Sequence, residues 1–154
     1  MDTVRFIHFL GSAMWIGGAL AAMVLAIRSR GESTEIQAGL FRMMTQVHTL
    51  VIGFGALMTL GSGVMWTMWL SQEGGAEATT PSVGVWIMQA TGLVGGALVL
   101  LVAIPTAMKM GGLAVTTEDG HLLPAFAHYR RRQMIVSSTA VVLAVLSLFT
   151  GVVL

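Results

Sequence analysis

Four long apolar segments constrain the fold of this chain more than any other feature. They cover approximately residues 4–27, 43–70, 83–108 and 134–154. Each is about as long as the roughly 20 residues that a helix needs to cross a bilayer. Lipid cannot hydrogen-bond the backbone, and the segments lack the alternating polarity of barrel strands. The sequence therefore predicts an all-α integral membrane four-helix bundle, forming a single transmembrane domain over residues 1–154.

Composition excludes several classes of function. Charged residues make up only 10% of the 154 residues, whereas soluble domains carry about 25%. The spans leave no room for a soluble domain, so the lipid bilayer is the expected partner. A net charge of +1 and the lack of an extended basic surface argue against nucleic acid as a partner. The chain has no cysteine, which excludes disulfides and thiolate metal sites.

The placement of charge predicts the orientation of the bundle. Seven of the eight basic residues lie near the connections after the first and third segments: Arg28, Arg30, Arg42, Lys109, Arg130, Arg131 and Arg132. The connection over residues 71–82 contains two glutamates and no basic residue. The positive-inside rule makes the two basic loops cytoplasmic and puts both termini outside. We expect a bacterial inner membrane protein whose tryptophans 66, 69 and 86 form an interfacial belt at the outer side.

Small and polar residues recur at three- and four-residue spacing within each segment, which places them on one helix face. Such faces allow the close packing that holds helices together in lipid. We therefore expect the following residues in the bundle interior: His8, Gly11, Ser12, Trp15, Gly18 and Ala22; His48, Ile52, Gly55, Thr59, Ser62 and Trp66; Gln89, Gly92 and Gly96; Ser137, Ala140, Ala144, Ser147 and Gly151.

Histidines are the candidate site residues, because an ionisable side chain within an apolar span is costly and usually functional. The predicted orientation puts His8 near the outer side and His48 toward the cytoplasm, roughly 15–25 Å apart in depth at ~1.5 Å per residue. One iron cannot reach both. On the inner side His48 can pair with His128, or with His121. A solvated position in the basic loop is the alternative for His121 and His128.

Neutral imidazole suits haem iron and copper, and histidine with methionine suits haem or Cu(I). No second histidine lies near His8, so its partner would be Met65, Met68 or Met88, or an open position. Haem b is thus the expected cofactor, with His8, His48 and His128 as candidate ligands. Copper is the second alternative, with His8 as its candidate ligand.

The pattern His8, Trp15, Gly17-Gly18 resembles the first helix of CopD-like membrane proteins of copper handling. It is also similar to the first helix of HemJ-like haem-binding membrane proteins. Either resemblance implies that His8 is a haem or metal ligand. HemJ-like proteins are expected to carry a functional lysine in a later helix, whereas the only lysine here is Lys109, at the membrane edge. The resemblance therefore implies a haem- or metal-binding four-helix scaffold and neither specific activity.

Two functions follow from these observations. The first is a b-type haem-binding membrane protein involved in electron transfer or in haem or metal handling. The second is a cofactor-free accessory or structural subunit of a larger respiratory or photosynthetic complex, with other membrane subunits as partners. The sequence indicates no catalytic residue. The spans contain no paired acid and base, which argues against a proton pump.

Overall fold

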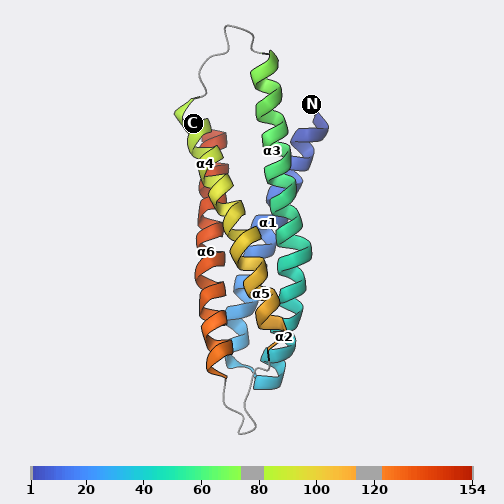
Figure 1. The fold of residues 1–154 in the computed structure, drawn as a ribbon, viewed down its shortest axis with the longest axis vertical. Helices are drawn as coiled ribbons and strands as arrows, with labels where there is room; N and C mark the ends of the chain where they lie inside the picture. Colours follow the sequence, from blue (N-terminus) through green and yellow to red (C-terminus); the bar gives the residue numbers. More distant parts are fainter. Residues whose placement is uncertain (1, 74–81, 114–122, 154) are drawn as a thin grey trace.

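A computed structural model describes residues 2–73, 82–113 and 123–153, and these residues form helices and no strands. The first span is α1 (Asp2–Arg28), followed by the short 3-10 helix η1 (Ser29–Gly31). The second joins α2 (Thr34–Gln46), the π-helix η2 (Val47–Gly53) and α3 (Phe54–Glu73). The third joins α4 (Val83–Leu98), the π-helix η4 (Val99–Ala103) and α5 (Ile104–Gly111). The fourth is α6 (Pro124–Val153) (Figure 1).

All four spans are long and apolar enough to cross a membrane, which confirms the predicted helical class and the four apolar spans. The helices extend beyond the predicted limits. The second span begins at Thr34 and not near residue 43, and the fourth begins at Pro124 and not near residue 134. Hydropathy marks where apolar residues stop, whereas a helix continues through polar turns because its own hydrogen bonds sustain it.

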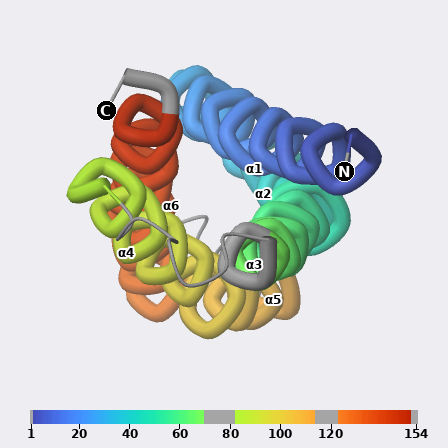
Figure 2. The backbone as a smooth tube through the Cα atoms, turned by 90° about the horizontal axis from the view of Figure 1, so that it is seen from above, coloured from blue at the N-terminus to red at the C-terminus, as the bar shows by residue number. Residues whose placement is uncertain are grey.

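The spans are arranged as two helical hairpins. In the first hairpin, α1 packs along η2 and α3; in the second, α4 packs along α6. The view down the bundle shows α1 beside α3 and α4 beside α6 (Figure 2). Packing between the hairpins is less extensive and involves mainly α2 with α5 and α1 with α6.

The predicted interior faces are largely confirmed, although Gly151 of α6 is exposed. Gly11, Trp15 and Ala22 of α1 are buried, as are His48, Ile52, Gly55 and Ser62 of the second span, Gly96 of α4, and Ala140 and Ala144 of α6. Large apolar side chains cover the outside, among them Phe9, Leu57, Leu101 and Val142. Soluble proteins rarely expose apolar surface on this scale, so the exterior fits lipid.

Both π-helices interrupt the regular ladder, and each lies beside a residue that disturbs it: a side chain that bonds a backbone carbonyl in η2, and a proline that lacks a backbone donor after η4. His48 Nδ1 lies 2.8 Å from the carbonyl oxygen of Met44, at the start of η2. Pro105 follows η4 and has no N–H to donate. Next to it, the Thr106 hydroxyl donates to the Val102 carbonyl at 2.6 Å. The third span therefore passes through Pro105 and ends at Gly111.

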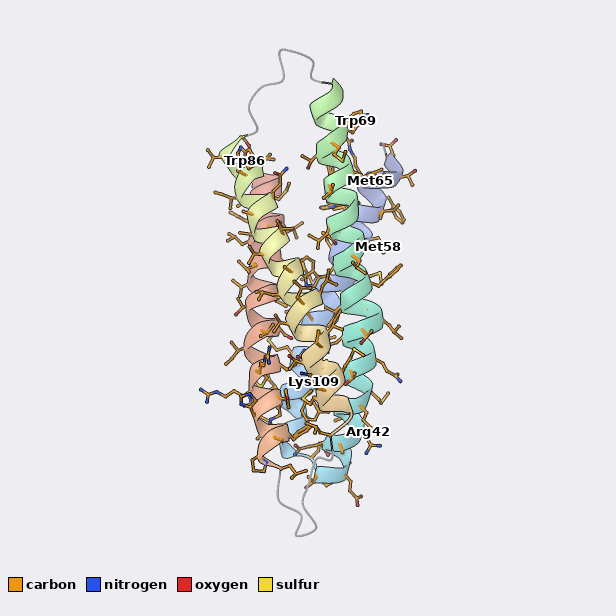
Figure 3. The ribbon with its side chains drawn as sticks, in the orientation of Figure 1. Arg42, Met58, Met65, Trp69, Trp86 and Lys109 are labelled. Carbon is orange, nitrogen blue, oxygen red and sulfur yellow. The ribbon has the colours of Figure 1, made fainter. Side chains whose placement is uncertain are left out.

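The two ends of the bundle differ in chemistry. At one end, called the basic end here, α1 and α6 carry arginines, and Arg42 and Lys109 lie nearby (Figure 3). At the other, the tryptophan end, Trp69 and Trp86 lie near the facing ends of α3 and α4 (Figure 3). The start of α1 and the end of α6 also lie at the tryptophan end (Figure 1). Most of the basic residues are thus separated from Trp69 and Trp86 along the bundle axis, and Arg5, which lies over the Trp66 ring, is the exception.

Candidate functional site

His48 occupies the most distinctive polar position in the bundle. It lies on η2 and is 4% exposed. A carbonyl oxygen can only accept, so the Nδ1 that faces Met44 must carry the proton. In the neutral ring Nε2 then carries the lone pair, and the Ser137 hydroxyl lies 3.4 Å from it. Metal-binding histidines are oriented in this way, with one ring N–H held by a carbonyl and the other nitrogen free to coordinate.

A cavity of about 260 Å³ opens beside His48. The first hairpin contributes residues of α1, α2 and η2, and the second contributes Met110 of α5 and one face of α6. Its walls are mainly apolar and flexible, including Met23, Phe41, Met44, Met110 and Met134. An apolar pocket with a few convergent polar groups is the usual form of a small-molecule site.

Gln133 supplies an unmet hydrogen-bonding group to this cavity. Its side chain is 6% exposed, and its Nε2 donates to Ser137 Oγ at 3.2 Å. Its Oε1 is buried and has no hydrogen-bond partner. A buried polar atom without a partner is expensive, typically by about 1–3 kcal/mol. The hydrogen-bonded series Gln133–Ser137–His48 therefore leaves one acceptor, Gln133 Oε1, to which a bound ligand or water can donate a hydrogen bond.

Two guanidinium groups lie at the edge of the cavity toward the basic end. Arg30 comes from η1 and is exposed, and Arg130 comes from the second turn of α6 and is half-buried. Arg30 Nη2 lies 3.8 Å from the sulfur of Met134. Within residues 2–73, 82–113 and 123–153, neither arginine forms an ion pair.

His8 lies in a separate polar cluster, near the tryptophan end. Its Nδ1 lies 3.0 Å from the Thr59 carbonyl oxygen and 3.1 Å from Ser62 Oγ. The ring meets the edge of Trp66 at a centroid distance of 6.1 Å, and Arg5 lies 5.2 Å from the Trp66 ring centroid. His8 is half-buried, and in the described part of the chain no hydrogen bond engages its Nε2. The bonding therefore leaves this nitrogen free, whereas the Ser137 hydroxyl lies 3.4 Å from Nε2 of His48.

The structure keeps the predicted ligands apart. His8 contacts Thr59, eleven residues beyond His48 on the same span, which at ~1.5 Å per residue is roughly 17 Å. This value agrees with the expected separation in depth. His128 is exposed, meets the ring of Tyr129 at 5.7 Å, and does not line the cavity. No hydrogen bond or ring contact joins His128 to His48, and His121 lies outside the described residues.

Reasoning from sequence missed Arg30, Gln133 and Met134 as site residues and treated Ser137 as packing only. A signal was present in α6, because Arg130, Gln133 and Ser137 follow one another at three- and four-residue spacing. His128 lies five residues before Gln133, which turns it about 140° away at 3.6 residues per turn. That rotation explains why His48 lies beside Ser137, which Gln133 contacts, and not beside His128.

A second hollow, of about 410 Å³, lies on the outer surface near η2 and η4. Its lining is almost wholly apolar, and Leu50, Phe54 and Leu57 within it are more than half exposed. It offers no side chain suited to hold a cofactor. Among the described residues, no group of three or more His, Cys, Asp or Glu side chains converges on a metal position.

Comparison of the chain with protein-family models, with curated proteins and with solved structures finds no match. The resemblance of the first helix to CopD-like and HemJ-like proteins therefore stays an expectation, as does the ligand role that it implies for His8.

Proposed function

We propose that this protein binds haem b within the membrane and serves in electron transfer or in haem handling, and that His48 would hold its iron. The observation that carries the proposal is the fixed tautomer of His48. Its Nδ1–H is held by the Met44 carbonyl, and its Nε2 lone pair is directed toward Ser137 beside the cavity. Haem b supplies reversible one-electron transfer when bound.

The donor set around His48 fits this cofactor. The thioethers of Met44, Met110 and Met134 line the same cavity, and methionine is a second axial ligand of haem in several proteins. The volume of about 260 Å³ is below the 300–1,000 Å³ typical of pockets that enclose a larger ligand. Methionine has three rotatable bonds, so these walls can move to widen the cavity.

The remaining residues would hold the cofactor and exclude water. Ala19, Ala22 and Phe41 provide an apolar wall. Ser137 would release Nε2 for coordination and keep its hydrogen bond from Gln133. Imidazole and thioether groups also suit Cu(I), so copper is the alternative occupant of the same donors.

An absorption spectrum tests this proposal directly. Protein purified in a neutral detergent after expression with ample haem should show a sharp Soret band and a reduced-minus-oxidised α band. Metal analysis of the same sample should find iron, whereas copper without a Soret band would favour the Cu(I) alternative. A spectrum without either band, from protein that also fails to bind added haemin, would reject the haem proposal.

In that case the cofactor-free accessory subunit becomes the better explanation. It predicts co-purification with larger membrane subunits in mild detergent.

We further propose that the basic end faces the cytoplasm and that the protein lies in a bacterial inner membrane with both termini outside. Arg42 and Lys109 lie at one end of the bundle, and Trp69 and Trp86 lie at the other (Figure 3). This separation supports the orientation, because basic residues near spans are retained on the cytoplasmic side.

The absence of native cysteine makes the orientation easy to measure. In spheroplasts, Asp2→Cys should react with a membrane-impermeant maleimide, and Glu32→Cys should react only after the membrane is permeabilised. Both side chains are exposed, so reactivity reports the side of the membrane and not burial. The opposite labelling pattern would reverse the orientation.

A further inference from the structure

Two guanidinium groups without an acidic partner border the His48 cavity. Arg30 and Arg130 reach it from different hairpins, one from η1 and one from α6. Neither forms an ion pair within the described parts of the chain. Guanidinium groups bind carboxylates and phosphates through two parallel hydrogen bonds, so a pair of them calls for an anionic ligand.

The neighbouring arginines show that this placement is specific. Arg131 and Arg132 follow Arg130 directly, but both are exposed and neither lines the cavity. Successive residues on a helix are turned about 100° from one another, so only one of the three can face the cavity. A general attraction to anionic lipid would not require that Arg30 and Arg130, from different hairpins, line the same cavity.

The same cavity also holds neutral polar groups. The rest of its lining is mainly apolar, and it includes His48 and Gln133, whose buried Oε1 has no hydrogen-bond partner. A ligand that fits this lining has an anionic end at the opening and a flat or flexible apolar body inside. A tetrapyrrole with free carboxylates has this form, with its carboxylates on the same edge of the macrocycle.

We propose that Arg30 and Arg130 form a carboxylate clamp, and that the clamp makes the site select tetrapyrroles with free carboxylates over their esters. The inference rests on the proposed function in placing a tetrapyrrole beside His48. It goes further in assigning recognition to two residues that do not contact the metal. Binding by the clamp therefore does not depend on iron.

Metal-free protoporphyrin and its dimethyl ester are the probes that isolate the clamp. Their fluorescence is titrated against the protein in dodecyl maltoside, a neutral detergent. We expect the wild-type protein to bind the diacid at least about tenfold more tightly than the diester, since the ester cannot form the charge-assisted hydrogen bonds that a carboxylate forms with a guanidinium group. The double variant R30Q/R130Q should lose this preference and bind both probes with similar affinity.

The matched control is R131Q/R132Q, which removes the same charge from the same end of the bundle. It should keep the preference for the diacid to within about twofold. Equal binding of diacid and diester by the wild-type protein would overturn the clamp, as would an equal loss in the control variant. Absence of binding by either porphyrin would overturn it as well.

A lipid phosphate can bind guanidinium groups as a carboxylate does, so a second experiment distinguishes the two. Phosphatidylglycerol added to the micelles should leave diacid binding within about twofold of that measured with phosphatidylcholine. Strong displacement by the anionic lipid alone would assign the arginines to lipid headgroups and overturn the proposal. Failure of the haem proposal is distinguishable, because it removes the Soret change on haemin addition and leaves the diacid preference intact.

Discussion

Replacing His48 by alanine is expected to abolish haem binding. Loss of a residue that only hydrogen-bonds a metal ligand already lowers metal affinity by about 10–100-fold. Loss of the ligand itself should therefore lower the affinity by more than about 100-fold. The measurement is a haemin titration followed at the Soret band, with circular dichroism to verify helical content. Added imidazole should restore the band in His48→Ala, because it can occupy the vacated space and coordinate in place of the side chain.

Two histidine variants serve as matched controls. His128 is exposed and does not line the cavity, so His128→Ala should bind haemin like the wild-type protein. His8 lies in the cluster with Thr59 and Ser62, roughly 17 Å away, so His8→Ala should also keep the band. Loss of the band in His8→Ala with retention in His48→Ala would move the site to the tryptophan end, as the family resemblance implies.

The second large effect is expected on stability, where α1 crosses α3. A Cβ added to Gly11 would lie 2.8 Å from the Gly55 carbonyl oxygen and 2.8 Å from the Thr59 nitrogen. A Cβ added to Gly55 would lie 2.7 Å from the Gly11 carbonyl oxygen and 2.7 Å from the Trp15 nitrogen. These neighbours are backbone atoms, so relief requires the two helices to separate.

Gly11→Ala and Gly55→Ala should each lower the free energy of unfolding by about 2–3 kcal/mol, the upper part of the range for overpacked interiors. Thermal unfolding in detergent measures the effect. The double variant should lose less than the sum of the single losses, because both substitutions act on one helix contact.

Gly17→Ala and Gly61→Ala are the controls, one on each of the same helices. Nothing lies within 4 Å of a Cβ added at either position. Each should therefore leave the free energy of unfolding unchanged or raise it by up to about 1 kcal/mol, because alanine is favoured over glycine within a helix. A loss at these positions equal to that at Gly11 and Gly55 would refute close packing of α1 on α3 as the cause.

The spans were predictable because burial in lipid leaves a strong and simple pattern. Long apolar runs mark the helices, and small residues such as Gly11 and Gly55 mark the faces where two backbones approach. The ends were less predictable, since the polar turns at Thr34 and Pro124 continue each helix beyond its apolar part. The two π-helices were not predicted, because they depend on local competition for backbone carbonyls at Met44 and near Pro105.

The cavity was harder to predict than the fold. Its wall is formed by residues distant in the sequence, with Arg30 and His48 from one hairpin and Met110, Arg130 and Gln133 from the other. The sequence correctly indicated that His48 is buried and that His8 lies at another depth. It placed Ser137 in the interior but could not indicate that this residue meets His48, because the contact depends on how the two hairpins pack against each other.

The division into two hairpins has a thermodynamic consequence. Each hairpin holds itself together along its length, whereas the cavity is shared between them. A ligand that contacts both walls acts as a bridge, so its binding and the association of the hairpins are linked equilibria. Ligand at 100 times its dissociation constant would add about 2.7 kcal/mol to the association.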